Sequence, residues 1–372
     1  MAALGVMISM SGAAGADEVV KIGFAAPLTG ALAQFGKETE TGAQLAVDEL
    51  NAHPLIVNGK AVQLVLDAQD DAGDPRAATQ VAQRLIDNGV VAIVGHMTSG
   101  TSVPASRLYH NAGVAQLSPG ATSPVYTHQG FATAFRLVAT DAAQGAALAD
   151  YAAHSLLVRN IVLIDDQSEY GESLASSFER AARKNGIEIA RREAISPYGM
   201  DFHALLTILK ALNPDAILFS GFVNAGVPFI RQARQLNLRS LILGGDGLCS
   251  EALGRLAGKS ADGVVCSIPG SDFRNSQRGA AFALRYRQRF GTEPDGFAPY
   301  SYDAVYVIAD AMTHAKSTAA GDILRTVSTT NLDGATGSIA FDQHGDLRKS
   351  ITTIFRYRNG DRDVVFVEKE AN

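Results

Sequence analysis

Short apolar runs alternate with amphipathic stretches along nearly the whole chain, and this alternation constrains the fold more than any other feature. The runs are almost continuous in apolar residues, which is typical of strands buried on both faces of a parallel sheet. The stretches between them repeat apolar residues at i, i+3, i+4 and i+7, the spacing of one buried helix face. We therefore predict an α/β fold in which helices cover both faces of parallel sheets.

These patterns place individual elements along the chain. Asp74 followed by Pro75 predicts a helix N-cap with proline at the first helical position, and Asp201 predicts a second cap. The last ~35 residues are rich in β-forming residues. The predicted strands are 20–26, 62–67, 90–95, 114–117, 161–165, 216–220 and 241–244, and the predicted helices include 101–111, 277–290 and 300–314.

The chain is long enough for two lobes, because 372 residues exceed one ordinary core. The alternation breaks around residues 135–141 and again around 266–271, where Ile268-Pro269-Gly270 interrupts the pattern. We therefore predict two doubly wound parallel-sheet lobes joined by a three-segment hinge. Lobe I is expected at 17–138 and 269–347, and lobe II at 139–268 and 348–372.

The first sixteen residues carry no charge and end in Ala14-Gly15-Ala16, which matches the small-x-small pattern before a signal-peptide cleavage site. We predict cleavage near Ala16 and export to the periplasm. The alternative, a membrane anchor, is disfavoured because about 20 apolar residues are needed to span a bilayer. The expected basic start of a signal peptide is missing, since no Lys or Arg precedes Lys21.

Composition and motif searches argue against several function classes. The net charge of −6 and the lack of a Lys/Arg cluster argue against nucleic-acid binding. The eight His residues are scattered, and the usual metal, phosphate, dinucleotide and nucleophile motifs are absent. We therefore expect no metal site, no cofactor and no enzymatic activity. The cluster Asp67, Asp70, Asp71 and Asp74 is interpreted as a solvated loop with one helix cap, because its spacing does not match a calcium-binding loop.

The chain has two cysteines, Cys249 and Cys266. Export permits a disulfide between them, but the sequence cannot supply its geometry. Their pairing stays open at this point.

Four small, polar turns follow predicted strands, which is where open α/β sheets bind ligands. The turn 95–101 leads into a helix whose N-terminus could hold a carboxylate, and 118–124 offers hydroxyls and free carbonyls. Turns 165–171 and 244–247 occupy equivalent positions in the second half of the chain. Each turn alone could be plain capping chemistry, but four together suit a cleft between lobes.

Many short runs then match one family in a consistent order over essentially the whole mature chain. The chain resembles the periplasmic leucine/isoleucine/valine-binding proteins, which have the type I periplasmic binding fold. The matching runs are Lys21-Ile22-Gly23-Phe24, Pro27-Leu28-Thr29-Gly30, Gln34-Phe35-Gly36, Gly42-Ala43-Gln44-Leu45-Ala46, Asp70-Asp71-Ala72-Gly73-Asp74-Pro75, Val94-Gly95-His96, Ser118-Pro119-Gly120-Ala121-Thr122, Phe135-Arg136, Tyr170-Gly171 and Gly337-Ser338-Ile339-Ala340-Phe341-Asp342.

The resemblance implies a clamp for an amino-acid zwitterion. The ligand carboxylate would accept bonds from two hydroxyls and from backbone N–H groups at a helix start, and the ammonium would meet a backbone carbonyl and an acid. Two aromatic residues of the second lobe would close over the ligand, and two Phe residues would shape the apolar end. The implied ligand-binding residues are Ser99, Gly120, Ala121, Thr122, Tyr170, Phe222, Asp246, Phe35 and Phe297. For the three Phe residues, plain core packing is the alternative.

The chain departs from the family pattern at several of these positions. Asp246 stands where Glu is usual, and Phe222 and Phe35 stand where a ring with a polar group is usual. Gly120 stands where Ala is common, which leaves slightly more room. The family's frequent disulfide would join positions 73 and 98, which hold no cysteine here.

The resemblance implies the solute-binding component of an ABC transporter, which closes two lobes around a branched-chain or aliphatic amino acid and docks on a membrane permease. We expect it to act as a monomer. Three alternatives stay open: the same fold binding an aromatic or polar amino acid, an amide-type sensor or regulator, and an enzyme of unknown type.

Overall fold

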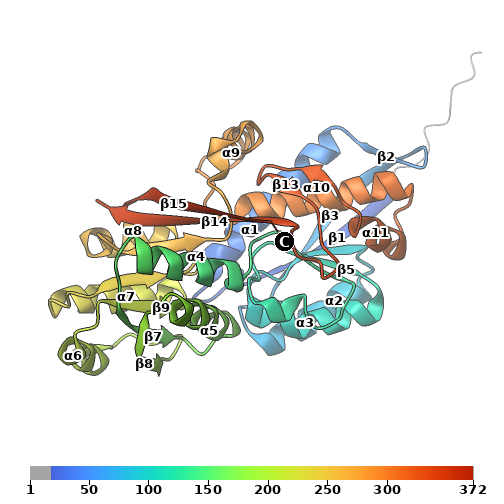
Figure 1. Cartoon of the computed structure of the whole chain (residues 1–372). Helices are drawn as coiled ribbons and strands as arrows, with labels where there is room; N and C mark the ends of the chain where they lie inside the picture. Colours follow the sequence, from blue (N-terminus) through green and yellow to red (C-terminus); the bar gives the residue numbers. More distant parts are fainter. Residues whose placement is uncertain (1–17, 372) are drawn as a thin grey trace, which may run out of the picture.

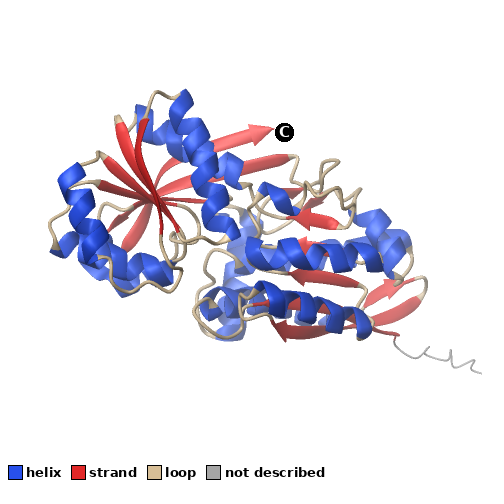
Figure 2. Cartoon of the chain, turned by 90° about the horizontal axis from the view of Figure 1, so that it is seen from below, coloured by secondary structure: helices blue, strands red, loops and turns tan. Residues whose placement is uncertain are grey.

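The computed structural model describes residues 18–371 and contains two α/β lobes, each built on its own sheet (Figure 1). The predicted signal peptide, residues 1–16, lies outside the described residues. Figure 2 shows helices flanking both sheets, as the alternation predicts. Among the described residues, no helix combines the length and the hydropathy that crossing a bilayer requires.

The first sheet has six strands in the order β2-β3-β1-β4-β5-β6. All neighbours are parallel except the edge strand β2, which pairs antiparallel with β3. The strands are β1 Glu18–Ala26, β2 Leu55–Val57, β3 Lys60–Asp70, β4 Ala92–Gly95, β5 Ala115–Ser118 and β6 Ala134–Arg136.

Helices cover both faces of this sheet because its central strand is apolar on both. Ile22 and Phe24 of β1 share a buried cluster with one helix pair, whereas Ala25 shares another cluster with a second pair. The first pair is α1 Ala33–Ala52 and α10 Ala298–Ala315, and the second is α2 Pro75–Asp87 and α3 Ser99–Ala112. Helix α9, Gln277–Phe290, contacts α1, and helix α11, Ala320–Val327, contacts α10.

The second sheet has seven strands in the order β15-β14-β11-β10-β9-β7-β8. Its parallel part is β8-β7-β9-β10-β11, and the C-terminal strands β14 and β15 add to it antiparallel. The strands are β7 Asn160–Asp165, β8 Glu188–Ala194, β9 Ala216–Ser220, β10 Leu241–Gly244, β11 Val265–Ile268, β14 Lys349–Arg358 and β15 Asp361–Ala371.

Five helices cover the second sheet in the same two-sided way. Leu163 and Leu218 pack with α4 Asp141–His154 and α5 Glu169–Lys184. Ile164 and Phe219, neighbours of those residues in the strands, point to the opposite face. That face is covered by α6 His203–Leu212, α7 Val223–Gln235 and α8 Glu251–Ala257. The remaining elements are β12 Leu332–Asp333, β13 Ser338–Ile339, η1 Pro124–Tyr126, η2 Gly258–Ala261 and η3 Phe273–Asn275.

The chain passes between the two sheets three times, after β6, after β11 and before β14. The crossing segments are hydrogen-bonded to each other or to adjacent strands: Ala139 N–H donates to Pro269 O at 3.1 Å, and Arg136 N–H donates to Gly345 O at 2.9 Å. Sheet membership supports the predicted division, with lobe I at 17–138 and 269–347 and lobe II at 139–268 and 348–372. We retain these boundaries as a proposal.

The seven predicted strands are confirmed, with ends shifted by up to three residues. The two predicted parallel sheets are confirmed, and β2, β14 and β15 add to them in antiparallel orientation. The Asp74 cap is confirmed, since its carboxylate accepts from the N–H groups of Arg76 and Ala77 at 2.8 Å. The second cap is misplaced by one residue: Phe202 is the N-cap of α6, although Asp201 accepts from the His203 N–H at 3.1 Å.

The acidic cluster after β3 is more structured than a solvated loop. Asp70 accepts from the Leu28 N–H at 2.8 Å, and the fully buried Asp71 contacts His96 Nδ1 at 2.6 Å. The prediction of a solvated loop is therefore wrong for Asp71. Within residues 18–371, no group of three or more His, Cys, Asp or Glu side chains is placed to hold a metal ion.

Candidate functional site

A small cavity lies between the lobes, where the carboxyl ends of strands from both sheets meet. It measures about 10 Å³, roughly the room of one water molecule. A solute as large as an amino acid can therefore enter only if the walls separate. The walls are formed by Phe35, Met97, Thr98, Ser99, Gly120, Tyr170, Phe222, Asp246, Gly247 and Phe297.

Seven of the nine predicted ligand-binding residues belong to these walls, and Ala121 and Thr122 do not. Their roles as ligand contacts stay predictions. Sequence reasoning did not assign Met97, Thr98 or Gly247, although all three lie in the polar turns singled out after strands. The signal for them was therefore present, but nothing in a single sequence says which residues of a turn face the cleft.

The N-terminus of α3 forms one wall. Its N-cap is Thr98, whose hydroxyl accepts from the Thr101 N–H at 3.3 Å. Ser99, the first helical residue, is buried, and its Oγ accepts from the Ser123 N–H at 3.1 Å. Because Ser99 Oγ accepts this bond, its own proton is free to donate to an anion. The N-terminal end of the helix adds a favourable field for negative charge.

The turns after β4 and β5 are held together through one backbone carbonyl. The carbonyl oxygen of His96 accepts from Ser118 Oγ at 2.7 Å and from Ser102 Oγ at 2.8 Å. The His96 ring is fixed in turn by Asp71 on Nδ1 and by the Tyr109 hydroxyl at 3.1 Å from Nε2. The turn after β4 is thus fixed both to the turn after β5 and to the core.

The turn after β5 has most of its backbone acceptors already engaged. Arg136 donates to Ala121 O at 2.8 Å and to Ser123 O at 3.0 Å, and the Asp141 N–H donates to Thr122 O at 2.8 Å. The Thr122 hydroxyl is buried and has no hydrogen-bond partner among the described residues. These bonds explain why the Ala121 carbonyl does not face the cavity.

The second lobe contributes an acid on the turn after β10. Asp246 is 4% exposed and accepts from Gln144 Nε2 at 2.9 Å, and Gln144 Oε1 accepts from Ser267 Oγ at 2.7 Å. The Tyr170 hydroxyl accepts from the Gly247 N–H at 3.0 Å, which fixes the same turn. Burial raises the pKa of Asp246 to about 6, and hydrogen bonds with Gln144 and Tyr170 oppose this.

Aromatic rings from both lobes fill the apolar end of the cavity. Phe35 lies 6.0 Å from Phe222 and 6.1 Å from Phe297 between ring centroids, both edge to face, and Tyr170 lies 5.0 Å from Phe222. Phe35 and Phe297 also belong to the main hydrophobic cluster. The core-packing interpretation and the cavity-wall interpretation therefore both apply to them.

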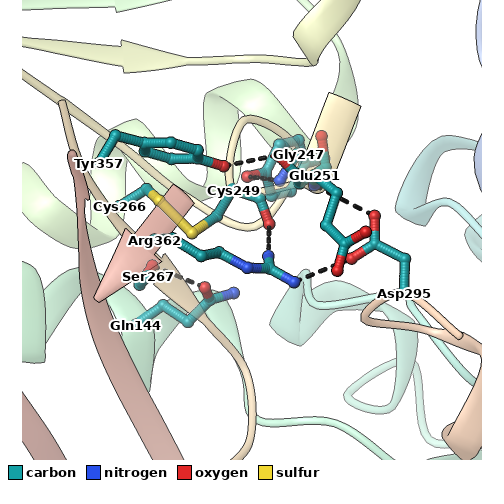
Figure 3. Close-up of a disulfide and its surroundings, with 11 residues drawn as sticks. Gln144, Gly247, Cys249, Glu251, Cys266, Ser267, Asp295, Tyr357 and Arg362 are labelled. Atoms are coloured by element: carbon teal, nitrogen blue, oxygen red, sulfur yellow. Dashed lines mark hydrogen bonds and ion pairs between the residues drawn. A yellow bond between two sulfur atoms is a disulfide. The ribbon is translucent and has the colours of Figure 1, made fainter. Parts of the chain in front are cut away.

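Cys249 and Cys266 form a disulfide, which settles the question the sequence left open (Figure 3). The bond joins the turn that carries Asp246 to strand β11. Arg362 donates to the Cys249 carbonyl at 2.6 Å and to Asp295 Oδ1 at 2.9 Å. Since Asp295 lies between α9 and α10 of the first lobe, this arginine ties the disulfide region to the opposite lobe.

A larger cavity of about 540 Å³ adjoins the small one and is lined by residues of both lobes. The two cavities share Thr98, Tyr170 and Phe222. Glu169, which lines the larger cavity, accepts from Ser123 Oγ at 2.9 Å, a direct bond between lobes. The outer cavity is thus the part of the cleft that leads from solvent to the inner walls.

The arrangement offers hydroxyl and helix-terminus donors on one lobe, a carboxylate on the other, and apolar rings beside them. Such a site can hold a small dipolar molecule with an apolar tail. Residues 19–360 match the periplasmic binding protein family. The chain belongs to this family. Its members are solute-binding proteins with two α/β lobes.

The relatives and solved structures that this family member resembles cover nearly its whole length. It is 29% identical over 343 residues to a leucine-, isoleucine-, valine-, threonine- and alanine-binding protein of Pseudomonas aeruginosa, with 92% of this chain and 91% of the relative covered. It is 30% identical to a leucine-specific-binding protein of Salmonella typhimurium, with 95% and 94% covered. A branched-chain amino acid transporter substrate binding protein of Streptococcus pneumoniae, solved with isoleucine, superposes with a TM-score of 0.86 at 30% identity, with 95% and 100% covered.

Proposed function

We propose that this protein is the periplasmic solute-binding component of an ABC transporter for branched-chain and other aliphatic amino acids. The observation that carries the proposal is that Ser99, at the start of α3, and Asp246, from the opposite lobe, line one cavity together with a cluster of Phe rings. Donors at one end and an acid at the other match the two charges of an amino acid, and the rings match an aliphatic side chain.

In the proposed complex, the ligand carboxylate accepts from the Ser99 hydroxyl and lies at the N-terminus of α3. The Thr122 hydroxyl, which is buried without a partner among the described residues, supplies a second donor. The ammonium donates to Asp246 and to the Gly120 carbonyl. Hydrogen bonds in which the donor or the acceptor is charged are roughly twice as strong as neutral ones, so the head group carries most of the affinity.

Closure of the lobes couples binding to transport. The Phe35 and Phe222 rings come from different lobes and touch across the cavity. A ligand between the lobes contacts both of them only when they are closed. Its binding free energy is therefore more favourable in the closed form, and binding shifts the population toward that form by this difference in free energy. The closed form is the one we propose to dock on a membrane permease. The protein performs no chemistry on the ligand and acts as a monomer.

A thermal-shift screen of the twenty amino acids tests the proposal. A ligand at 100 times its dissociation constant stabilises the folded protein by about 2.7 kcal/mol, and we expect leucine, isoleucine or valine to give the largest shift. Ser99→Ala and Asp246→Ala should abolish the shift. Asp322→Ala, a control on α11 whose side chain is paired with Arg325, should retain it. If no amino acid shifts the unfolding temperature of the wild type, the proposal is wrong.

A further inference from the structure

A second carboxylate lies beside the acid of the site and has no assigned role. Asp141, the first residue of α4, is fully buried, and among the described residues no hydrogen bond of ordinary geometry reaches its carboxylate oxygens, although the Ser173 and Thr122 hydroxyls lie close enough to lower its pKa. Its charge and that of Asp246 act on each other. The Thr122 hydroxyl faces this carboxylate and favours its ionised form, and the backbone carbonyl of Thr122 accepts from the Asp141 N–H at 2.8 Å.

The surroundings do not neutralise this pair of acids. Arg136 is the cation that acts on Asp141, but its guanidinium is already bound to Asp346 and to two backbone carbonyls. From α5, Ser173 contributes a hydroxyl near Asp141, and Tyr170 is a neutral neighbour because burial keeps its pKa well above the usual value.

The Asp246 side of the pair is equally short of positive charge. Gln144 donates to Asp246, and behind it Ser267 of β11 donates to Gln144. On α10, burial raises the pKa of Tyr300, so that this ring is neutral too. Among the described residues, the cation that acts on Asp141 is Arg136, and it is already bound to Asp346. Burying two ionised carboxylates in such a region is costly unless a proton or a ligand cation is also present.

We propose that Asp141 is a further determinant of ligand recognition: with Asp246 it forms a pair of carboxylates that holds a proton in the free protein, and the ammonium group of the ligand replaces that proton on binding. The inference rests on the proposed function, because it needs a ligand with an ammonium group. The released proton passes to the buffer, and the net charge around the two acids is unchanged because the ammonium takes the place of the proton. Asp141 acts through the shared charge of the pair and selects ligands that bring a cation.

The titration of the two acids supports this exchange. Burial, and after it the charge of Asp246, raises the pKa of Asp141 to about 7, and burial raises that of Asp246 to about 6. A bound ammonium lowers both values, because it favours the ionised acids. Binding therefore releases protons below about pH 7, and affinity is highest above that pH and falls as the pH is lowered.

Isothermal titration calorimetry with L-leucine at about pH 6.5 tests the exchange and is repeated in phosphate, PIPES and imidazole buffers. The number of protons released is the slope of the observed binding enthalpy plotted against the ionisation enthalpy of the buffer. The two pKa values predict release of about one proton and a dissociation constant roughly 100-fold weaker at pH 5.5 than at pH 8. In Asp141→Asn, only Asp246 still titrates. The release should fall to about a quarter of a proton and the change in dissociation constant to about fourfold.

Asp322→Asn, which removes an acid from the first turn of a helix away from the site, should behave like the wild type. If Asp141→Asn does not fold, Asp141→Ser takes its place, since serine keeps a small polar side chain at this position and the Thr140 cap of the helix is retained. The inference is overturned if the wild type binds leucine without releasing a proton, or if an Asp141 variant keeps the full release. Either result leaves the proposed function standing. Wild type that binds no amino acid at any pH overturns both.

Discussion

Reducing the Cys249–Cys266 disulfide should destabilise the protein by about 3 kcal/mol. The cysteines are 17 residues apart, and closing a loop of that length removes about 11 cal/mol/K of chain entropy from the unfolded state, or about 3 kcal/mol at 25 °C. The bond lies inside lobe II and joins the turn before α8 to β11. The loss should therefore appear in the unfolding of that lobe.

The assay is urea unfolding followed by far-UV circular dichroism, since the chain contains no Trp for fluorescence. Wild type is measured with and without a reducing agent, and Cys249→Ala/Cys266→Ala serves as the matched control. Reduction should lower the midpoint of the wild type and leave that of the double variant unchanged. Thiol titration of the treated wild type should first show two free thiols, which proves that the disulfide is reduced. If the free energy of unfolding then falls by less than about 1 kcal/mol, the reasoning is wrong.

Three further outcomes are expected. Asp246→Ala should weaken leucine binding by about 3 kcal/mol, or roughly 150-fold by isothermal titration, because it removes the buried partner of the ammonium; a loss below fivefold contradicts this role. Gly42→Ala should cost about 2 kcal/mol in urea unfolding, because its Cβ would clash with Ala298 O where α1 crosses α10; an unchanged midpoint refutes the close contact. Arg136→Met should cost about 3 to 5 kcal/mol in the same assay, since it leaves Asp346 buried without its cation; retained stability would show that the pair is dispensable.

Strand positions were predictable because buried parallel strands must be continuous in apolar residues. Three strands in the parallel parts of the sheets, β6, β8 and β11, were not predicted, and the reason is clearest for β8. Strand β8 was missed because it lies at the edge of its sheet, and most of its side chains, among them Arg191, Arg192 and Glu193, are polar. Edge strands face solvent, so they lack the apolar signal that identifies the others.

The walls of the site were predictable in outline, since polar turns after strands converge at one edge of each sheet. The sequence did not indicate the role of Asp141, which looks like an ordinary acid in the first turn of a helix. Its burial beside Asp246 depends on how two segments 105 positions apart pack, as residue numbers 141 and 246 show. Pairing of the two cysteines could not be predicted for the same reason, because only the folded backbone brings them within 5.4 Å between Cα atoms.

The most direct test of the account compares leucine with two molecules of nearly the same shape, 4-methylpentanoate, which lacks the ammonium, and 3-methylbutylamine, which lacks the carboxylate. Isothermal titration at about pH 8 should show both binding at least about 100-fold more weakly than leucine, since each leaves one buried polar end of the site without a partner. If either analogue binds within about tenfold of leucine, recognition does not depend on gripping both charges, and the proposed clamp is contradicted.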